Sequence, residues 1–237
     1  MLEAFGPDGR ELGLAELARR AKLPKATTFR LTSQLVGLGA LERNGDAYRL
    51  GLRLFELGAT VARQRRLRDA ALPFMEDLYE ATHETIHLGV LAGLDVLYIE
   101  KIAGRRGSAV RTQVGTRKPL YCTALGKAIL SHADPSLLEA VVDAGISRHS
   151  PHTLTSPHRL AEELSIAATD GVAYDREEYR LGTTCVASPL LDRGRLAVGA
   201  LSVTGLTGRF YPERAAAAVR TAALGLSRAL DGSPWPT

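Results

Sequence analysis

The sequence of 237 residues predicts an α+β protein in two parts: a small N-terminal winged helix-turn-helix, and a larger C-terminal domain with an antiparallel sheet flanked by helices. Two observations predict this class. Between positions 23 and 51, a helical pattern is followed at once by a tight hairpin pattern. After position 84, paired strand-like runs surround a block of helical segments, which is typical of a sheet covered by helices.

The helix of the 23–51 stretch has recognisable ends. Pro24 suits a first turn, where its missing N–H costs no hydrogen bond, and Gly39 suits a left-handed C-terminal cap. Between them, apolar or small residues recur at the spacing of a one-sided helix. These positions are Thr28, Leu31, Leu35 and Leu38.

A short β-ribbon is predicted to follow this helix. Residues 40–43 and 46–50 flank Asn44-Gly45, the strongest short-range signal for a two-residue hairpin turn. Upstream, residues 14–21 predict a short amphipathic helix, which a brief break separates from the next one. Two such helices form a helix-turn-helix, and the ribbon is a wing. In that motif the second helix enters the DNA major groove.

A long helical pattern follows the wing. It runs from Leu52 through Leu67 and contains the basic run 63–68. We interpret it as a solvated linker helix whose position still allows contacts with the DNA backbone. The chain therefore divides into a winged helix-turn-helix at 1–51, a linker helix at 52–69 and a C-terminal domain at 70–237.

The C-terminal domain begins with a helical pattern at 70–82, with Pro73 near its start, and then mixes strands and helices. The predicted strands are β-rich runs bounded by turn residues. They are expected at 85–91, 95–102, 108–114, 171–178, 184–192 and 196–204. Further helices are expected at 123–131, 135–143, 157–169 and 212–230.

Composition indicates a soluble globular protein. Hydrophobic residues make up 45% and charged residues 24%, which are ordinary values. No apolar run approaches the roughly 20 residues that span a bilayer, and the N-terminus lacks a signal-peptide pattern. The two cysteines, Cys122 and Cys185, imply no disulfide scaffold. We therefore expect a cytoplasmic protein with no membrane partner and no cofactor.

The net charge of +4 is unevenly distributed. Residues 1–68 contain 13 Lys and Arg against 7 Asp and Glu, whereas residues 69–237 contain 17 against 19. A basic N-terminal part on a slightly acidic remainder suits a module that neutralises phosphates. The alternative is a solvated basic surface without a partner.

The outward face of the second helix provides candidate DNA contacts, and the wing tip adds two more. Arginine and lysine reach guanine edges or phosphates, while Thr, Ala and Phe pack on thymine methyl groups. Phe29 is either a base contact or a lid on the wing. The wing-tip residues are expected to meet phosphate or the minor groove. The predicted set is Lys25, Ala26, Thr27, Phe29, Arg30, Ser33, Arg43 and Asn44.

Two histidine patterns resemble metal sites without matching their geometry. Residues 83–87 spell the HExxH pattern of zinc proteases, which works only on a helix. The β-branched residues within this segment lead into a strand, where positions four apart lie about 13 Å from each other, too far to share one zinc ion. His149, His152 and His158 lie in a loop without cysteine or carboxylate at ligand spacing, so solvated histidines are the better interpretation. No metal site is predicted.

Two further features suggest chemistry. Cys185 could be a nucleophile, but the sequence nominates no partner histidine, and a lone cysteine entering a strand is usually a small core residue. Thr123 is expected to cap the helix after it and to leave the N–H groups of residues 124–126 free. Such a helix end can cradle an anion, and the alternative is an ordinary capped helix.

Five collinear segments resemble the IclR family of bacterial transcriptional regulators, over nearly the whole chain. One segment alone is weak, but five in the same order are strong. The first is the helix-turn-helix with its wing. The others are Pro-Leu…Thr-Ala-Leu-Gly-Lys-Ala at 119–128, Gly-Val-Ala-Tyr-Asp-Arg-Glu-Glu at 171–178, Gly…Cys-Val-Ala-Ser-Pro at 182–189 and Ala-Leu-Ser-Val-Thr-Gly at 200–205.

The resemblance implies a winged helix-turn-helix, a linker helix and a C-terminal effector domain that binds a small metabolite, often a carboxylate or an aromatic acid. Members of this family are typically dimers, or dimers of dimers, that act as repressors or activators. The resemblance also implies an effector pocket in the C-terminal domain. Its implied ligand-binding residues are Val110, Thr123, Ala124, Leu125, Asp175, Cys185, Ser202 and Thr204.

Two features of this chain bear on what the resemblance implies. Ser202 and Thr204 alternate along a strand, so both hydroxyl groups face one side, whereas Asp175 beside an acidic ligand needs a bridging donor or a proton. Of the first helix usual in the family only residues 1–5 remain, and Thr28 and Thr32 replace aliphatic residues. We expect the DNA-binding module to pack less tightly for that reason.

These observations favour a DNA-binding transcriptional regulator, not an enzyme, whose binding to a double-stranded operator is modulated by a small organic or aromatic acid. The expected mechanism is a shift between conformations with different operator affinities. The alternative is a small-molecule enzyme that uses Cys185 or Asp175 and carries the basic module as an accessory.

Overall fold

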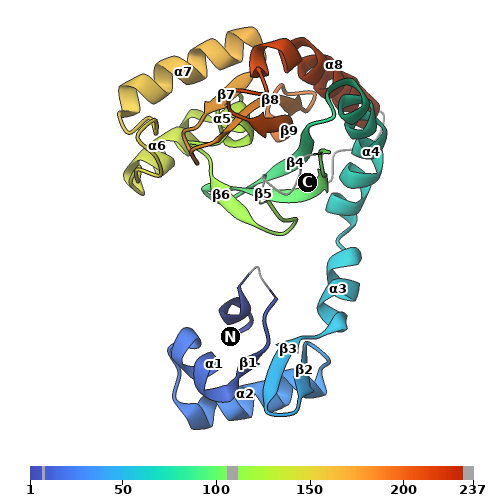
Figure 1. Cartoon of the computed structure of the whole chain (residues 1–237), viewed down its shortest axis with the longest axis vertical. Coiled ribbons are helices and arrows are strands. Elements are labelled where there is room, and N and C mark those ends of the chain that lie inside the picture. The colour runs from blue at the N-terminus through green and yellow to red at the C-terminus, as the bar shows by residue number, and fades with distance from the viewer. Residues whose placement is uncertain (7–8, 106–111, 232–237) are drawn as a thin grey trace. The chain divides into compact units, whose positions relative to one another are not determined.

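The computed structural model describes residues 1–6, 9–105 and 112–231 (Figure 1). The chain forms two compact units, residues 1–65 (unit 1) and 66–237 (unit 2). Both match the predicted class: unit 1 is a small helix-turn-helix with a β-ribbon, and unit 2 is an antiparallel sheet flanked by helices. Among the helices in the described ranges, none is long and apolar enough to cross a bilayer.

Unit 1 contains the predicted pair of short helices and the wing. Its elements are the 3-10 helix η1 (Leu2–Phe5), β1 (Leu12–Gly13), α1 (Leu14–Ala21), α2 (Lys25–Gly37), β2 (Leu41–Asn44), β3 (Ala47–Leu50) and α3 (Leu52–Ala59). The three strands are antiparallel in the order β1-β3-β2. The sequence does not predict β1, because two residues are too few for a periodic pattern and only pairing with β3 makes them a strand.

Gly39 provides the left-handed cap that follows α2, as the sequence predicts. Gly39 has a φ of +71°, a conformation that only glycine adopts at little cost. Its N–H donates to Val36 O at 2.9 Å, and the Ala40 N–H donates to Leu35 O at 2.9 Å. These two bonds form a Schellman motif, which satisfies carbonyl groups in the last turn of the helix.

The hairpin turn of the wing lies one residue later than predicted. Asn44 pairs with Ala47 across the ribbon, so the two loop residues are Gly45 and Asp46. Gly45 has a φ of +58°, whereas the φ of Asp46 is not positive. Glycine at the first central position is the pattern of a type II′ turn, whose twist matches that of the flanking strands.

The buried face of α2 differs from the predicted one. Leu38, predicted to face inward, is 71% exposed because the helix ends just before it. Thr28 is fully buried as predicted, and Thr32, which the pattern did not include, is fully buried as well. Each hydroxyl group donates to a carbonyl oxygen of the preceding turn. The helix packs beside a cluster made of Phe5, Leu12, Leu17, Leu41 and Tyr48.

The linker region also differs from prediction. One helix was expected over 52–69 and another over 70–82, but α3 ends at Ala59 and a single helix, α4 (Ala62–Thr82), runs through Pro73. A proline inside a helix removes one hydrogen bond, so packing must hold α4 together there. Its buried residues recur every three or four positions on both sides of Pro73: Leu67, Ala71, Met75 and Leu78.

Unit 2 is built on a six-stranded antiparallel sheet in the order β6-β5-β4-β9-β8-β7. Hairpins join β4 to β5 and β8 to β9, as predicted. The strands are β4 (Thr85–Ala92), β5 (Asp95–Ile102), β6 (Arg117–Pro119), β7 (Ala173–Arg176), β8 (Thr183–Leu191) and β9 (Ala197–Leu206). The helices after α4 are α5 (Ala124–Leu130), α6 (Pro135–Asp143), α7 (Pro157–Asp170) and α8 (Pro212–Asp231).

One predicted strand is wrong where the structure can test it. The expected strand at 108–114 falls partly outside the described residues, and its described part, 112–114, is not a strand. The edge strand β6 lies just downstream and pairs with β5. Its three residues, Arg117–Pro119, lack the β-branched character that marks a strand in sequence, so the pairing partner decides their conformation.

Both faces of the sheet are covered by helices (Figure 1). One face packs against α4 and α8, which lie side by side, as Phe74 and Gly225 show by their close approach. The other face packs against α5, and α7 lies behind α5. Because side chains alternate along a strand, each strand supplies one set of residues to each core.

A fully buried lysine holds α5 against the turn that follows β7. Lys127 is 0% exposed, and its ammonium group donates to Glu178 Oε1 at 2.6 Å and to Glu163 Oε1 at 3.3 Å. The second carboxylate oxygen of Glu178 is buried without a hydrogen-bond partner among the described residues. Glu178 therefore depends on Lys127 for most of the compensation for its lost hydration.

We predict that Lys127→Met destabilises unit 2 by about 3–5 kcal/mol, because it leaves the Glu178 carboxylate buried without a counter-charge. Urea unfolding followed by circular dichroism measures this free energy. The double variant Lys127→Met/Glu178→Leu removes both charges and should recover most of the loss. An unchanged unfolding midpoint for the single variant would contradict this account.

Candidate nucleic-acid interface and ligand pocket

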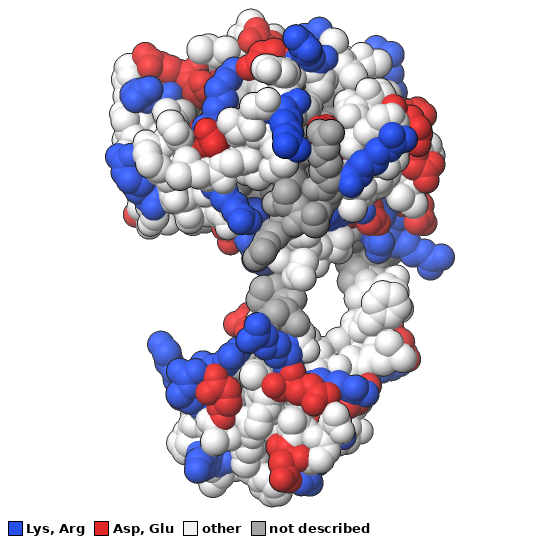
Figure 2. All heavy atoms as spheres, in the orientation of Figure 1, with Lys and Arg blue, Asp and Glu red and all other residues white. Residues whose placement is uncertain are grey.

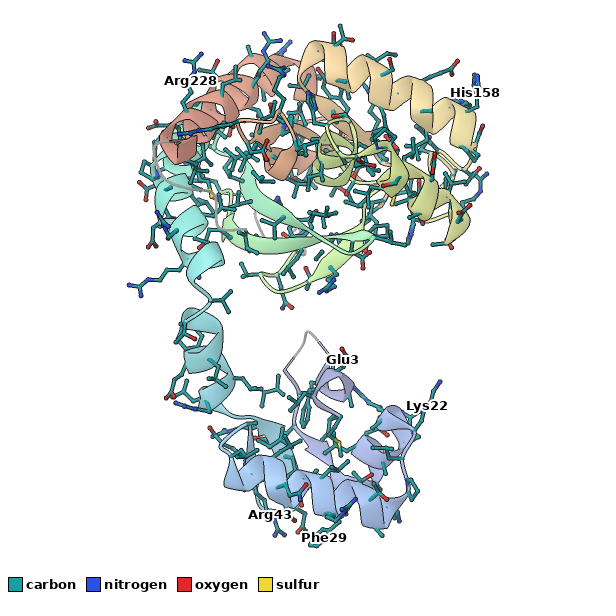
Figure 3. All side chains as sticks on the ribbon, turned by 180° about the vertical axis from the view of Figure 1, so that it is seen from behind. Glu3, Lys22, Phe29, Arg43, His158 and Arg228 are labelled. Atoms are coloured by element: carbon teal, nitrogen blue, oxygen red, sulfur yellow. The ribbon has the colours of Figure 1, made fainter. Side chains whose placement is uncertain are left out.

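Helix α2 presents the predicted DNA-contacting side chains at the surface of unit 1. Phe29 is 54% exposed and projects from the outer edge of the unit, as does Arg43 of the wing (Figure 3). This exposure favours the interpretation of Phe29 as a base contact. Thr27 is half-buried, and the exposed members are Lys25, Ala26, Phe29, Arg30 and Ser33.

The side chains at the wing tip form hydrogen bonds within unit 1 that the sequence does not predict. Arg43 Nε donates to Gly45 O at 2.8 Å. The Asn44 amide donates to both carboxylate oxygens of Glu11, at 3.0 and 3.2 Å. A contact between the Asn44 amide and DNA would have to replace the bonds to Glu11, which sequence reasoning missed because the two residues lie far apart in the chain.

Charges of both signs share the surface of unit 1 (Figure 2), and most of its arginines are paired. By contrast, Lys25 and Arg30 make no hydrogen bond or ion pair through their side chains with any described residue. The cations of α2 are thus available for phosphates or base edges. Pairs elsewhere in the unit include Arg19 and Arg20 with Glu16, Arg43 with Asp46, Arg49 with Glu42 and Glu11, and Arg53 with Glu56.

The second candidate site is a pocket in unit 2, on the sheet face that packs against α5. Its cavity volume is about 30 Å³. That volume holds about two water molecules, since one needs roughly 10–15 Å³. A larger ligand would require the lining side chains to move apart. The lining is mostly polar and aromatic, which suits a small ligand with a charged or hydrogen-bonding group.

Of the eight residues predicted from the family resemblance, four line this pocket, three do not, and one lies outside the described residues. Ala124 and Leu125 belong to the adjacent apolar core. Ser202 is buried on the same face, opposite His87 of β4 and Ala187 of β8, but outside the lining. Val110 lies outside the described residues. The four lining residues are Thr123, Asp175, Cys185 and Thr204.

The predicted anion cradle at the start of α5 is only partly available. Thr123 caps the helix as expected, and its hydroxyl oxygen accepts from the Gly126 N–H at 3.1 Å. The expectation that the Gly126 N–H is free is therefore wrong, because the capping side chain that marks the helix start also consumes this donor. This agrees with the alternative of an ordinary capped helix.

Several pocket residues are ones that sequence reasoning missed, and they come from six segments of unit 2. Lys118 is the edge-strand cation, and its ammonium group lies 5.3 Å from the centre of the Tyr98 ring and 4.4 Å from that of Tyr179. No sequence signal identifies the missed residues as one set, because they are distant in the chain and only the folded sheet brings them together. They are His87, Tyr98, Thr112, Lys118, Tyr179, Arg180 and Thr183.

His87 is a neutral hydrogen-bonding group at the base of the pocket. Burial, assisted by the positive charges of Lys101 and Lys118, lowers the pKa of His87 to about 3. Its Nε2 atom shares a hydrogen bond of 2.6 Å with the Thr112 hydroxyl group, and its Nδ1 atom lies 3.4 Å from Thr204 Oγ1. A neutral imidazole can donate through one nitrogen and accept through the other.

Burial shifts the acidic and thiol groups of the pocket toward their neutral forms. Burial, assisted by the nearby Glu178 carboxylate and opposed by hydrogen bonds from backbone N–H groups, raises the pKa of Asp175 to about 7. Asp175 Oδ1 accepts from the Glu178 N–H at 2.7 Å. Burial also raises the pKa of the Cys185 thiol well above its usual value, so the reactive thiolate is disfavoured.

The histidine patterns do not form metal sites. The HExxH segment straddles the end of α4 and the start of β4, as the strand prediction requires. Within the described ranges, no group of three His, Cys, Asp or Glu residues could hold a metal ion. His149 is not merely solvated, since its ring packs against Tyr179 at 5.2 Å and its Nε2 atom lies 3.1 Å from the Tyr121 hydroxyl group.

The raised pKa of Asp175 predicts a pH-dependent stability. A folded-state pKa of about 7 against an ordinary value of 3.8 means that the proton on Asp175 stabilises the fold fully below about pH 4. This contribution is lost as the pH rises to about 7. We therefore expect the melting temperature of the wild type, relative to that of Asp175→Asn, to decrease as the pH is raised from 5 to 8. A difference that stays constant over this range would contradict the assignment.

Two known sequence families match the chain over most of its length. Residues 1–45 match the IclR helix-turn-helix domain, and residues 59–228 match the C-terminal domain of the bacterial transcriptional regulator IclR. The chain is 33% identical to the HTH-type transcriptional regulator KdgR of Escherichia coli, over 100% of this chain and 92% of that protein. It is 33% identical to the glycerol operon regulatory protein of Streptomyces coelicolor, over 97% and 93% of the two chains.

A solved structure shows the same architecture. An IclR homologue from Microbacterium hydrocarbonoxydans, complexed with 4-hydroxybenzoate, matches with a TM-score of 0.90 and 30% identity, over 98% of this chain and 96% of the other. The winged helix-turn-helix, the helix-covered antiparallel sheet and the two family matches agree with one another. The chain therefore belongs to the IclR family of bacterial transcriptional regulators.

Proposed function

We propose that this regulator binds its operator through α2 and the wing, and that a small organic or aromatic acid in the pocket of unit 2 sets the operator affinity. The observation that carries the DNA side of this proposal is the pair of cations on α2, Lys25 and Arg30, which no acidic residue in the described ranges neutralises. The proposed DNA-contacting set remains that of the sequence analysis.

The lining of the pocket supports an acid as the effector. It contains a lysine, an arginine and two tyrosines, and its own carboxylic acid, Asp175, has a raised pKa. Cations and aromatic rings suit a planar anion, and a protonated Asp175 does not repel it. The homologue that is complexed with 4-hydroxybenzoate holds a ligand of this class. The proposed mechanism is a population shift, in which the acid prefers one of two conformations with different operator affinities.

We also propose that the chain has no enzymatic activity. The alternative enzyme would use Cys185 or Asp175. The Cys185 thiol accepts a hydrogen bond from the Thr204 hydroxyl group at 3.1 Å, and burial opposes its ionisation. A nucleophilic cysteine needs the opposite environment, one that stabilises the thiolate. The relatives named above are named as regulators.

The proposed assembly is a homodimer or a dimer of dimers, acting in the cytoplasm where operator DNA lies. Helix α3 supports it with an unpartnered apolar face, which comprises Leu52, Phe55 and Ala59. These residues are spaced by three and four, so they share one side of the helix. Phe55 is 73% exposed and Leu52 is 64% exposed. A second copy of the chain would remove this surface from water. The proposed division remains a DNA-binding domain at 1–51, a linker at 52–69 and an effector domain at 70–237.

Arg30→Ala tests the DNA interface. We expect its operator affinity to fall by about 1–3 kcal/mol if Arg30 reads a base edge, or the salt dependence of log Kd to weaken by roughly one unit if it contacts phosphate. Mobility-shift titrations on promoter-proximal DNA at several salt concentrations measure both.

Arg159→Ala, which removes one exposed positive charge from α7, is the matched control and should bind like the wild type. Equal losses in the two variants would mean that only net charge matters. If the wild type bound no DNA at low salt and showed a turnover abolished by Cys185→Ala, the regulator assignment would give way to the enzyme alternative.

Phe55→Glu tests the assembly. Placing a carboxylate in a buried apolar contact should weaken self-association by about tenfold or more, that is, by about 1.4 kcal/mol or more. Sedimentation velocity over a range of protein concentrations measures the dissociation. Ile166→Glu on α7, which alters an exposed apolar residue in unit 2, serves as the control. A Phe55→Glu chain that sediments like the wild type at every concentration would refute α3 as the contact.

A further inference from the structure

Lys118 occupies a distinctive place in the pocket. It pairs with Val96 in the register of β5 and β6. Residues that face each other across two strands point to the same side of the sheet, and Tyr98 lies two residues from Val96, so all three share the pocket face. The Lys118 ammonium group lies 4.4 Å from the centre of the Tyr179 ring and 5.3 Å from that of Tyr98.

The hydrogen-bonding capacity of Lys118 is unused. The ammonium group has three donors, yet it makes no hydrogen bond or ion pair with any residue that the structure describes. The Lys118 side chain is half-buried, and this burial lowers the pKa of its ammonium group. The two tyrosine rings attract the cation but accept no conventional hydrogen bond from it. The Lys118 ammonium group therefore lacks an anionic hydrogen-bond acceptor among the described residues.

The other cations near the pocket have partners or are exposed. Lys101 donates to Thr112 O at 2.8 Å, and Lys127 is bound to Glu178. Arg180 lies exposed at the rim. Asp175 is not an ion-pair partner of Lys118, and its Oδ1 atom already accepts from the backbone N–H groups of Glu178 and Tyr179. Lys118 thus differs from the rest in being a half-buried charge that faces the cavity without an acceptor.

We propose that Lys118 binds the carboxylate of the effector and makes the pocket select an acid over a neutral molecule of the same shape. The two tyrosine rings near the ammonium group would contact the body of the ligand, and Thr204 with the neutral His87 would meet a polar group of the ligand. The ligand class is a small monocarboxylate with a planar or aromatic body. This inference rests on the proposed function, because it names a contact within the same pocket.

The test compares acids with their amides, which have nearly the same shape but no charge. The probes are 4-hydroxybenzoate, benzoate, pyruvate and lactate, each beside its primary amide. Isothermal titration calorimetry on the full chain measures each Kd for the wild type, Lys118→Gln, Lys118→Arg and Arg117→Gln. Arg117 is the matched control, since it lies on the same strand and carries the same charge, but points to the other side and donates to Ala92 O.

The wild type should bind at least one acid about tenfold or more tightly than its amide. Lys118→Gln should abolish this preference by weakening the acid alone, Lys118→Arg should keep it, and Arg117→Gln should leave both affinities unchanged. An acid preference that persists in Lys118→Gln overturns this inference and leaves the proposed function intact. Equal weakening of acid and amide also overturns it, because that result indicates a structural role. If no acid binds the wild type, the proposed effector class fails, and this inference fails with it.

Discussion

The buried ion pair between Lys127 and Glu178 is the interaction on which the pocket depends. It joins α5 to the turn after β7, two segments that are far apart in the sequence. The same turn places the N–H groups of Glu178 and Tyr179 on Asp175, and it presents Tyr179 to the cavity. A buried carboxylate without its lysine would cost several kcal/mol. The geometry of the pocket is therefore tied to the stability of the domain.

The two faces of the sheet in unit 2 serve different purposes. The face toward α4 and α8 is an apolar core, whereas the face toward α5 carries polar side chains from β4, β7, β8 and β9 around the cavity. Within this polar set, burial favours the neutral forms of His87, Asp175 and Cys185. The charges of the lining that remain available to a ligand are those of Lys118 and the exposed Arg180. Of these two, Lys118 is the partly buried one, and its ammonium group makes no hydrogen bond with any described residue.

Unit 1 uses its charges in a complementary way. Arg19, Arg20, Arg49 and Arg53 are paired with nearby carboxylates, and such exposed pairs add little stability. Their effect is to neutralise the surface away from the recognition helix, where Lys25 and Arg30 keep their charge without a partner. The helix itself is anchored by Thr28 and Thr32, whose hydroxyl groups bond within the helix and so are buried without unmet hydrogen bonds.

The sequence by itself determined what local patterns encode. The bounds of α1, α6 and β5, the cap at Thr123 and the Schellman end at Gly39 follow from periodicity and from residues with strong conformational preferences. The family and its two-part architecture also followed from collinear motifs. Tertiary structure decided the short strands β1 and β6, the passage of α4 through Pro73, and the membership of His87, Tyr98, Lys118 and Tyr179 in the pocket. These depend on strand pairing and packing between residues distant in the chain, which no local pattern records.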